Sequence, residues 1–163
     1  MREVDLGSSI RGRLFLHSMP GRWEDFDEFL RQLARSPVTL IVSLASRDEI
    51  KRKSPSYYAA ITSGTLPIPL QEFAIEDFSA PSDFEAFRDF VLGIRDRVVG
   101  GDCVLVHCGA GIGRTGMFAQ CLLMALGFSK EEAKKRVAAA GSIPEVREQE
   151  SLVEWFNTQV KRS

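Results

Sequence analysis

The stretch HCGAGIGRTG, residues 107–116, contains a cysteine and an arginine six positions apart, with three alternating glycines between them. Glycine is costly in regular structure, so the three alternating glycines between Cys108 and Arg114 indicate a backbone with a special shape. Successive backbone N–H groups in such a turn can bind an anion, and the start of a following helix adds positive potential. The glycines by themselves therefore predict an anion site.

The cysteine and the arginine add reactivity to this anion site. N–H groups that bind an anion also stabilise a thiolate, so we expect Cys108 to act as a nucleophile at neutral pH. Arg114 can grip two phosphate oxygens in bidentate fashion while it stays charged. Thr115 is placed to donate its hydroxyl toward the sulfur when the thiolate leaves again. The expected phosphate-binding residues are Gly109, Ala110, Gly111, Ile112, Gly113 and Arg114.

The elements that must position this stretch alternate between strands and helices. Hydrophobic patterning predicts strands at 13–17, 38–44, 65–70 and 102–107, and the prolines of the third place it at a sheet edge. It also predicts helices at 23–36, 54–64, 84–98, 115–128, 130–140 and 145–162. The apolar stripe of the first helix consists of Trp23, Phe26, Leu30 and Leu33. We expect a capping box of Ser82 and Glu85 to open the third helix, with Asp83 in its first turn. Ser129 and Glu132 form a second capping box.

This alternation predicts a single α/β domain over residues 1–163, with a central, mostly parallel sheet of about four to five strands and helices on both faces. Ligands of such sheets bind beyond the carboxyl ends of the strands. The loop that begins at Cys108 follows a predicted strand directly and lies at such an end.

Composition and charge limit the binding partners and the cellular location that we expect for the protein. The net charge of −1 argues against general nucleic-acid binding, and no apolar run approaches the ~20 residues that span a bilayer. The amino-terminal residues show no apolar segment of a secretory signal. The three cysteines fit neither a disulfide framework nor a zinc spacing. We therefore expect a cytoplasmic monomer with no membrane or nucleic-acid partner.

The stretch also carries a family resemblance. It contains the pattern H-C-x5-R-T and closely resembles the phosphate loop of the cysteine-dependent protein tyrosine phosphatases, and VHCGAGIGRTGMF (106–118) is most similar to the large tyrosine-specific members. The Trp-Pro-Asp acid loop and the tyrosine-recognition loop of those members are missing. Chain length and layout instead resemble the compact dual-specificity branch.

The resemblance implies a two-step reaction through a cysteinyl-phosphate on Cys108, with no metal or other cofactor. In the compact branch the general acid is an aspartate roughly thirty residues before the cysteine, and EDFSAPS offers Asp77. Glu76 is the rival and Asp83 a more distant one. The resemblance also implies a glutamine that positions the hydrolytic water, for which Gln149 is suitably placed.

Several side chains keep an ordinary structural alternative. His107 is expected to order the loop and tune the thiolate, or else is simply a histidine at a strand end. Cys121 lies on a buried helix as a small core residue. Cys103 lies about 16 Å along the strand from Cys108, beyond disulfide reach, so a redox switch is not expected. A basic cluster flanks the pocket or is ordinary surface charge: Arg47, Lys51, Arg52 and Lys53.

The substrate is expected to be a phosphorylated protein. The loop interior holds no lysine, which argues against a polyphosphorylated inositol, and Ile112 can contact an aromatic leaving group. Phosphotyrosine therefore fits best, and a shallow pocket would also admit phosphoserine and phosphothreonine. Two alternatives remain open. One is a phosphatase of a phosphoinositide, nucleotide or RNA 5′-phosphate, and the other is a module that binds phosphoproteins without turnover.

Overall fold

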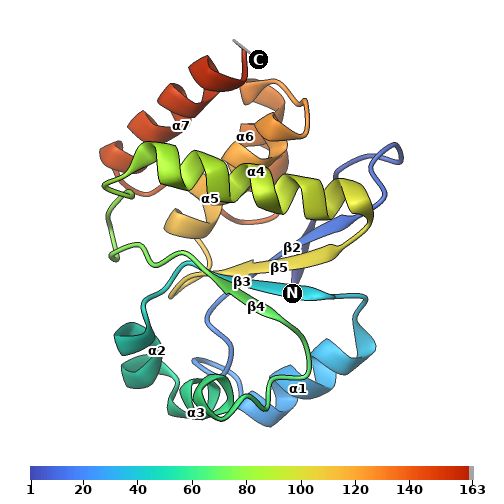
Figure 1. Cartoon of the computed structure of the whole chain (residues 1–163), viewed down its shortest axis with the longest axis vertical. Helices are drawn as coiled ribbons and strands as arrows, with labels where there is room; N and C mark the ends of the chain where they lie inside the picture. Colours follow the sequence, from blue (N-terminus) through green and yellow to red (C-terminus); the bar gives the residue numbers. More distant parts are fainter. Residues whose placement is uncertain (162–163) are drawn as a thin grey trace.

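The computed structural model describes residues 1–161 and shows one mostly parallel sheet between two layers of helices (Figure 1). Within this range the sheet has five strands in the order β1-β2-β5-β3-β4. They are β1 (Arg2–Val4), β2 (Arg13–His17), β3 (Leu40–Ser43), β4 (Leu70–Glu72) and β5 (Cys103–His107). Among the strand pairs of residues 1–161, only β1–β2 is antiparallel. The predicted α/β fold is confirmed.

The helices divide between the two faces of the sheet (Figure 1). One face carries α1 (Phe26–Arg35), α2 (Arg47–Lys53) and α3 (Pro55–Ser63), and the other carries α4 (Phe84–Gly100), α5 (Gly113–Ala125), α6 (Lys130–Ala139) and α7 (Arg147–Val160). Among the helices of residues 1–161, none has the length and apolar character that crossing a membrane requires.

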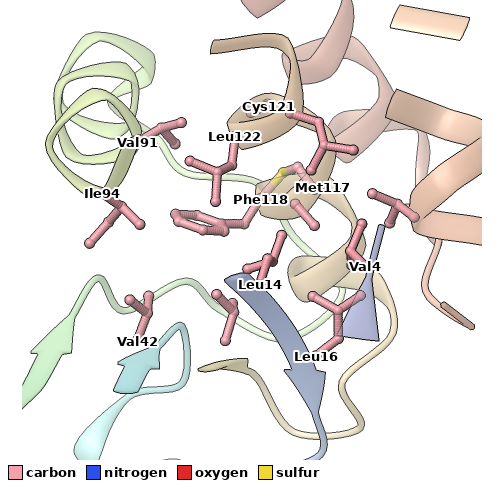
Figure 2. Packing of buried hydrophobic residues seen from close by; sticks show 14 of the residues in the cluster. Val4, Leu14, Leu16, Val42, Val91, Ile94, Met117, Phe118, Cys121 and Leu122 are labelled. Atoms are coloured by element: carbon pink, nitrogen blue, oxygen red, sulfur yellow. The ribbon is translucent and has the colours of Figure 1, made fainter. Parts of the chain in front are cut away.

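Alternating strand residues build a hydrophobic core on each face. Leu14 and Val106 belong to the larger core, where Phe118 of α5 packs between the sheet and α4 (Figure 2). Phe15 and Leu105, one position along each strand, belong to the smaller core against α1. This period of two is what a sheet covered on both faces requires, and it fixes the register of the strands.

The four parallel strands end at the same edge of the sheet. His107 at the end of β5 is level with His17 of β2 on one side and with Ser43 of β3 on the other. The segments that follow these strands therefore meet beyond this edge. They are the turn after β2, the start of α2, the loop after β4 and the glycine-rich loop after β5.

Helices α1 and α2 differ from the prediction. The helix expected at 23–36 begins only at Phe26, because the Asp25 side chain caps it by accepting from the N–H of Asp27. Trp23, assigned to the buried stripe of that helix, precedes it and is 63% exposed. Helix α2 was not predicted, because RDEIKRK contains a single apolar residue and so no hydrophobic period.

Other element boundaries also moved. The strand expected at 65–70 is displaced to Leu70–Glu72, where it does form the sheet edge, and β1 was not predicted. Asp83, not Ser82, caps α4, since its Oδ1 accepts the N–H of Ala86 at 2.9 Å. The helix expected at 145–162 begins at Arg147, and its last expected residue lies outside the described residues.

Candidate active site

The glycine-rich loop runs from the end of β5 into the first turn of α5. Cys108 is 2% exposed, and its Sγ accepts a hydrogen bond from the backbone N–H of Gly111 at 3.3 Å. Gly111 has a φ of 74°, and a Cβ there would lie 2.2 Å from the carbonyl oxygen of His17. Only glycine can occupy this position. The curled backbone expected from the sequence is present and aims an N–H group at the sulfur.

Two side chains hold this loop from behind through one carbonyl group. The guanidinium of Arg2 in β1 and the hydroxyl of Ser142 each donate to the carbonyl oxygen of Gly111 at 2.6 Å. Arg2 also donates to the carbonyl groups of Ala140 and Gly141. Burial lowers the pKa of Arg2, and the nearby Cys108 acts in the opposite direction. Sequence reasoning missed both residues, because neither lies near the loop in the chain.

Arg114 lies almost fully buried beside the loop and is held by a carboxylate that sequence reasoning missed. Its two terminal nitrogens donate to the carboxylate of Glu49 on α2, at 2.7 and 2.9 Å. Nη1 also donates to the carbonyl group of Ile75, and Nη2 donates to Oδ1 of Asp77 at 2.9 Å. The remaining donor, Nε, is buried and has no partner among the described residues. An oxyanion that displaced Asp77 would therefore find the Nε–Nη2 edge of the guanidinium free, the edge that binds oxyanions in bidentate fashion.

Glu49 and Arg114 shift each other's pKa. Burial would raise the pKa of its carboxyl, but hydrogen bonds from Arg114 and Lys53 lower that pKa to about 2. Burial alone would lower the pKa of Arg114, yet the bond to Glu49 and the charges of Cys108 and Asp77 raise it. Ser46 and Glu49 carry the S-x-x-E pattern of a capping box, and Ser46 does cap α2. That pattern was the available sequence signal for this helix.

Of the three carboxylates considered as the general acid, Asp77 is the one that reaches the loop. Besides Arg114, it contacts Nζ of Lys53 at 3.3 Å, and its side chain is 44% exposed. The Glu76 carboxylate is exposed and makes no hydrogen bond or ion pair with any described residue. Asp83 caps α4 rather than lying in its first turn as expected. Asp77 therefore stays the candidate acid.

The basic cluster, for which a place beside the pocket and ordinary surface charge were both open, separates into two groups. Lys53 enters the site, where it bridges Glu49 at 2.8 Å and Asp77. Arg47 pairs with Glu72 on the surface, and Lys51 lies over the ring of Tyr58. Only one member of the cluster thus joins the candidate site.

His107 is a buried link between the loop and α3. Its Nδ1 lies 3.1 Å from the carbonyl oxygen of Cys108, and its Nε2 lies 2.9 Å from the hydroxyl of Tyr57. A carbonyl oxygen can only accept, so Nδ1 carries the proton and Nε2 accepts from Tyr57. Burial lowers the pKa of His107 to about 4, which keeps the ring neutral. Sequence reasoning did not identify Tyr57.

Gln149 and Thr115 are both buried beside the glycine-rich loop. Gln149 is buried, donates to the carbonyl group of Ser79 at 3.0 Å and accepts from the N–H of Glu145 at 2.8 Å. Its Oε1 lies 3.1 Å from where a Cβ of Gly113 would be, so it joins the Asp77 loop to the glycine-rich loop. The Thr115 hydroxyl is buried without a partner among residues 1–161. Its donation to the sulfur when the thiolate leaves stays a prediction.

The other cysteines lie away from this chemistry. Cys103 and Cys121 are buried and, like Cys108, form no disulfide within the described part of the chain. Burial raises the pKa of Cys121 well above its ordinary value. Cys121 belongs to the larger hydrophobic core, as predicted (Figure 2).

Solved structures share the whole arrangement of elements. Tk-PTP in its active form is 24% identical with a TM-score of 0.72, and the alignment covers 97% of each chain. Kinase associated phosphatase, with its catalytic-site cysteine replaced by serine, has a TM-score of 0.80 at 16% identity over 99% of this chain and 96% of that one. PTPMT1 in complex with PI(5)P has a TM-score of 0.71 at 16% identity over 91% and 92% of the two chains. At these identities the likeness shows the fold.

Sequence comparison finds a shorter likeness and a family. Tyrosine-protein phosphatase non-receptor type 4 of Mus musculus is 42% identical over 60 residues, which is 33% of this chain and 6% of that protein. The sequence model of PTP-SAK, described as Swiss Army Knife protein, DSP-PTPase phosphatase domain, matches residues 9–163. The resemblance to the compact dual-specificity branch is thereby confirmed, and the chain belongs to this DSP-PTPase phosphatase domain family.

Proposed function

We propose that this protein hydrolyses phosphate monoesters on proteins, chiefly phosphotyrosine and also phosphoserine and phosphothreonine, through a cysteinyl-phosphate intermediate. The observation that carries the proposal is the ion pair between Arg114 and Asp77, 2.9 Å long, beside the loop that curls around Cys108. It brings a phosphate clamp, a proton carrier and a nucleophile together. A module that only binds phosphoproteins would need neither the cysteine nor the carboxylate.

Arg114 and the loop bind the phosphate group in this proposal. The backbone N–H groups of residues 109–113 and the Nε–Nη2 edge of Arg114 receive the phosphate oxygens, which replace Asp77 as the partner of Nη2. Glu49 keeps the guanidinium oriented through two hydrogen bonds throughout. Because these donors are already in place, they stabilise the charge of the transition state without reorganising.

The reaction has two steps. In the first, the Cys108 thiolate attacks phosphorus, the bond to the ester oxygen breaks, and Asp77 gives its proton to that oxygen. In the second, a water oxygen attacks phosphorus and its proton passes to Asp77. The bond from phosphorus to sulfur then breaks, which releases inorganic phosphate and restores the thiolate. Gln149, which lies between the Asp77 loop and Gly113, would hold that water.

The surroundings of the loop favour an aromatic ester. Ile112 is partly exposed at the start of α5, and Phe78, next to Asp77, is 64% exposed. Phe78 has a φ of 54°, a left-handed conformation that a bulky residue adopts at a cost. Apolar side chains at the mouth of a phosphate site can pack on the ring of phosphotyrosine.

Steady-state kinetics on matched substrates test this function. The wild-type protein is assayed with phosphotyrosine, phosphoserine and phosphothreonine peptides, a phosphoinositide, a nucleotide and an RNA 5′-phosphate, beside Cys108→Ser and Cys121→Ser. Cys108→Ser should lose turnover yet still bind a phosphotyrosine peptide, whereas Cys121→Ser should keep turnover. Turnover that persists in Cys108→Ser contradicts the mechanism. A higher kcat/KM for the non-protein substrates contradicts the substrate class.

A further inference from the structure

The turn after β2 is fastened to the phosphate loop. The N–H of Met19 donates to the carbonyl oxygen of Gly109 at 3.1 Å, and the N–H of Arg22 donates back to the carbonyl oxygen of Met19. The buried hydroxyl of Ser54 donates to the carbonyl group of Pro20 at 2.7 Å. The turn that carries Arg22 is therefore held in place relative to the residue that follows the nucleophile.

Within this turn, the Arg22 guanidinium lies against the loop. One of its terminal nitrogens is 3.1 Å from the position that a Cβ of Gly109 would take. Nη2 of Arg114 lies equally close to that point, and Oε1 of Glu49 lies 2.8 Å from it. Glycine at position 109 thus leaves the space in which two guanidinium groups and one carboxylate meet.

Arg22 forms no ion pair with a described residue, although the Glu49 carboxylate lies near it. Its guanidinium carbon lies 4.2 Å from the centre of the Trp23 ring, and it makes no hydrogen bond or ion pair with any described residue. A cation stacked on an indole ring keeps its N–H groups available at the edge. Arg22 is thus an oriented donor with no partner within residues 1–161.

The local charge favours an additional anion. Glu49 is already shared by Arg114 and Lys53, and Asp77 bridges the same two cations. Arg22 brings a third positive charge to these two carboxylates. Once Asp77 carries the proton for the leaving group, Glu49 is the one of these two carboxylates that stays charged, and it pairs with Arg114 and Lys53. Neither carboxylate pairs with Arg22, so this cation can bind a negative group of the substrate outside the phosphate site.

We propose that Arg22, oriented by Trp23, forms a subsite for an acidic group next to the phosphorylated residue of a protein substrate. The proposal rests on the proposed phosphatase function and names a feature of its substrate. The chemistry is bidentate recognition of a carboxylate or of a second phosphate by a guanidinium. It makes Arg22 a specificity-determining residue.

The apolar surroundings of the subsite favour a polypeptide over a small phosphate ester. Four large hydrophobic side chains are exposed among the described residues, and three of them, Trp23, Phe78 and Ile143, belong to loops next to the phosphate loop. The backbone of Ile143 packs on Gly116 in the first turn of α5. Side chains that flank a phosphorylated residue can cover such a rim, whereas a sugar or inositol phosphate would leave it exposed to water.

The experiment compares the kcat/KM of the protein for peptides with and without an acidic flanking residue. Three phosphotyrosine peptides differ only in the flanking residue, which is alanine, aspartate or a residue with a non-hydrolysable phosphonate side chain. The second and third peptides separate a carboxylate from a phosphate as the source of the charge. We expect the wild-type kcat/KM to be about tenfold higher for at least one acidic peptide than for the alanine peptide.

Substitutions of Arg22, of Trp23 and of a matched control arginine test which residue causes the preference for the acidic peptide. Arg22→Met, which keeps the aliphatic stem, should reduce the ratio of the two kcat/KM values to about one. Trp23→Ala should give an intermediate ratio, because the guanidinium loses its stack. Arg11→Met, an exposed arginine at the opposite end of β2, removes the same charge and should keep the wild-type ratio.

Three results would overturn the subsite alone, and a fourth would overturn it together with the proposed function. If Arg22→Met lowers kcat/KM equally for the acidic and alanine peptides, Arg22 acts on the scissile phosphate and not on a second group. If Arg11→Met reduces the ratio as much as Arg22→Met does, the preference comes from overall charge. A wild-type protein that hydrolyses all the peptides equally has no such subsite. If it hydrolyses none of them while cleaving a phosphoinositide, the proposed function itself is wrong and the subsite fails with it.

Discussion

Glu49 and Arg114 face each other through two hydrogen bonds of 2.7 and 2.9 Å, although 65 positions separate them in the chain. Both side chains are nearly inaccessible, with exposed fractions of 6% and 1%. A guanidinium held along one edge by a carboxylate can present only its other edge to a ligand. This pair therefore determines how the proposed phosphate clamp is aimed.

Glu49→Gln should weaken both stability and phosphate binding. Removing one member of a buried ion pair costs up to about 3–5 kcal/mol of unfolding free energy, and the pair with Asp77 offsets part of the charge left on Arg114. Inorganic phosphate and vanadate should also bind more weakly, since Arg114 can rotate. Glu72→Gln breaks the exposed pair with Arg47 and should cost at most about 1 kcal/mol. Urea unfolding and inhibitor titration measure both effects, and equal behaviour of the two variants would refute this role of Glu49.

Asp77→Asn should lose rate according to the leaving group. A general acid matters most when the leaving oxygen is basic, so kcat on a phosphotyrosine peptide should fall by about 10²–10⁴-fold and much less on an activated aryl phosphate. Glu76→Gln removes the neighbouring carboxylate, which has no partner among the described residues, and should leave both rates near wild type. The reverse pattern, with Glu76→Gln sensitive to the leaving group, would identify Glu76 as the acid.

Gly111→Ala should abolish the loop geometry. The added Cβ would meet the carbonyl oxygen of His17 at 2.2 Å, besides the strain of a φ of 74°. Gly127→Ala is a matched control, since Gly127 has a φ of 99° but open space around it. The control should cost about 1–2 kcal/mol in thermal or urea unfolding and leave turnover intact. Gly111→Ala should cost more and lose turnover, and an active Gly111→Ala protein would contradict the observed loop.

Stability should fall below neutral pH because of two buried histidines. Burial lowers the pKa of His107 and of His17 from 6.5 to about 4. The unfolded chain therefore binds protons before the folded protein does. Unfolding free energy should decrease as the pH falls from 6.5 toward 4, by up to about 1.4 kcal/mol per pH unit for each histidine. Urea titrations at pH 8, 6 and 5 measure this slope, and His17→Gln should reduce it.

Glu49 should add a second, more acidic phase to this profile. Its pKa is lowered to about 2 against an ordinary 4.5, so the stability that it contributes is present above pH 4.5 and is lost as the pH falls toward 2. Glu49→Gln should remove this phase while keeping the histidine phase. A profile of that variant that matches wild type below pH 4.5 would contradict the assignment.

The accuracy of the sequence-based prediction differed between elements for physical reasons. Strands β2, β3 and β5 were predicted because continuous apolar runs are typical of strands buried on both faces. Helix α2 was missed because its seven residues bury little and its main contact is ionic. Trp23 was assigned to a buried stripe from its spacing alone. That assignment was wrong, because a hydrophobic period cannot indicate where a cap residue such as Asp25 starts the helix.

The site shows the same division. Cys108, Arg114 and the glycines are local in the chain, so their spacing alone was enough to predict an anion-binding loop with a nucleophile and a cation. Glu49 and Arg22 meet this loop because the parallel strands bring their carboxyl ends to one edge of the sheet. Arg2 meets it because β1 pairs with β2. Side-chain contacts between segments far apart in the chain depend on strand order and register, and no local pattern of residues encodes those. The chain alone therefore determined which chemistry is available, and the tertiary structure decided which charges surround it.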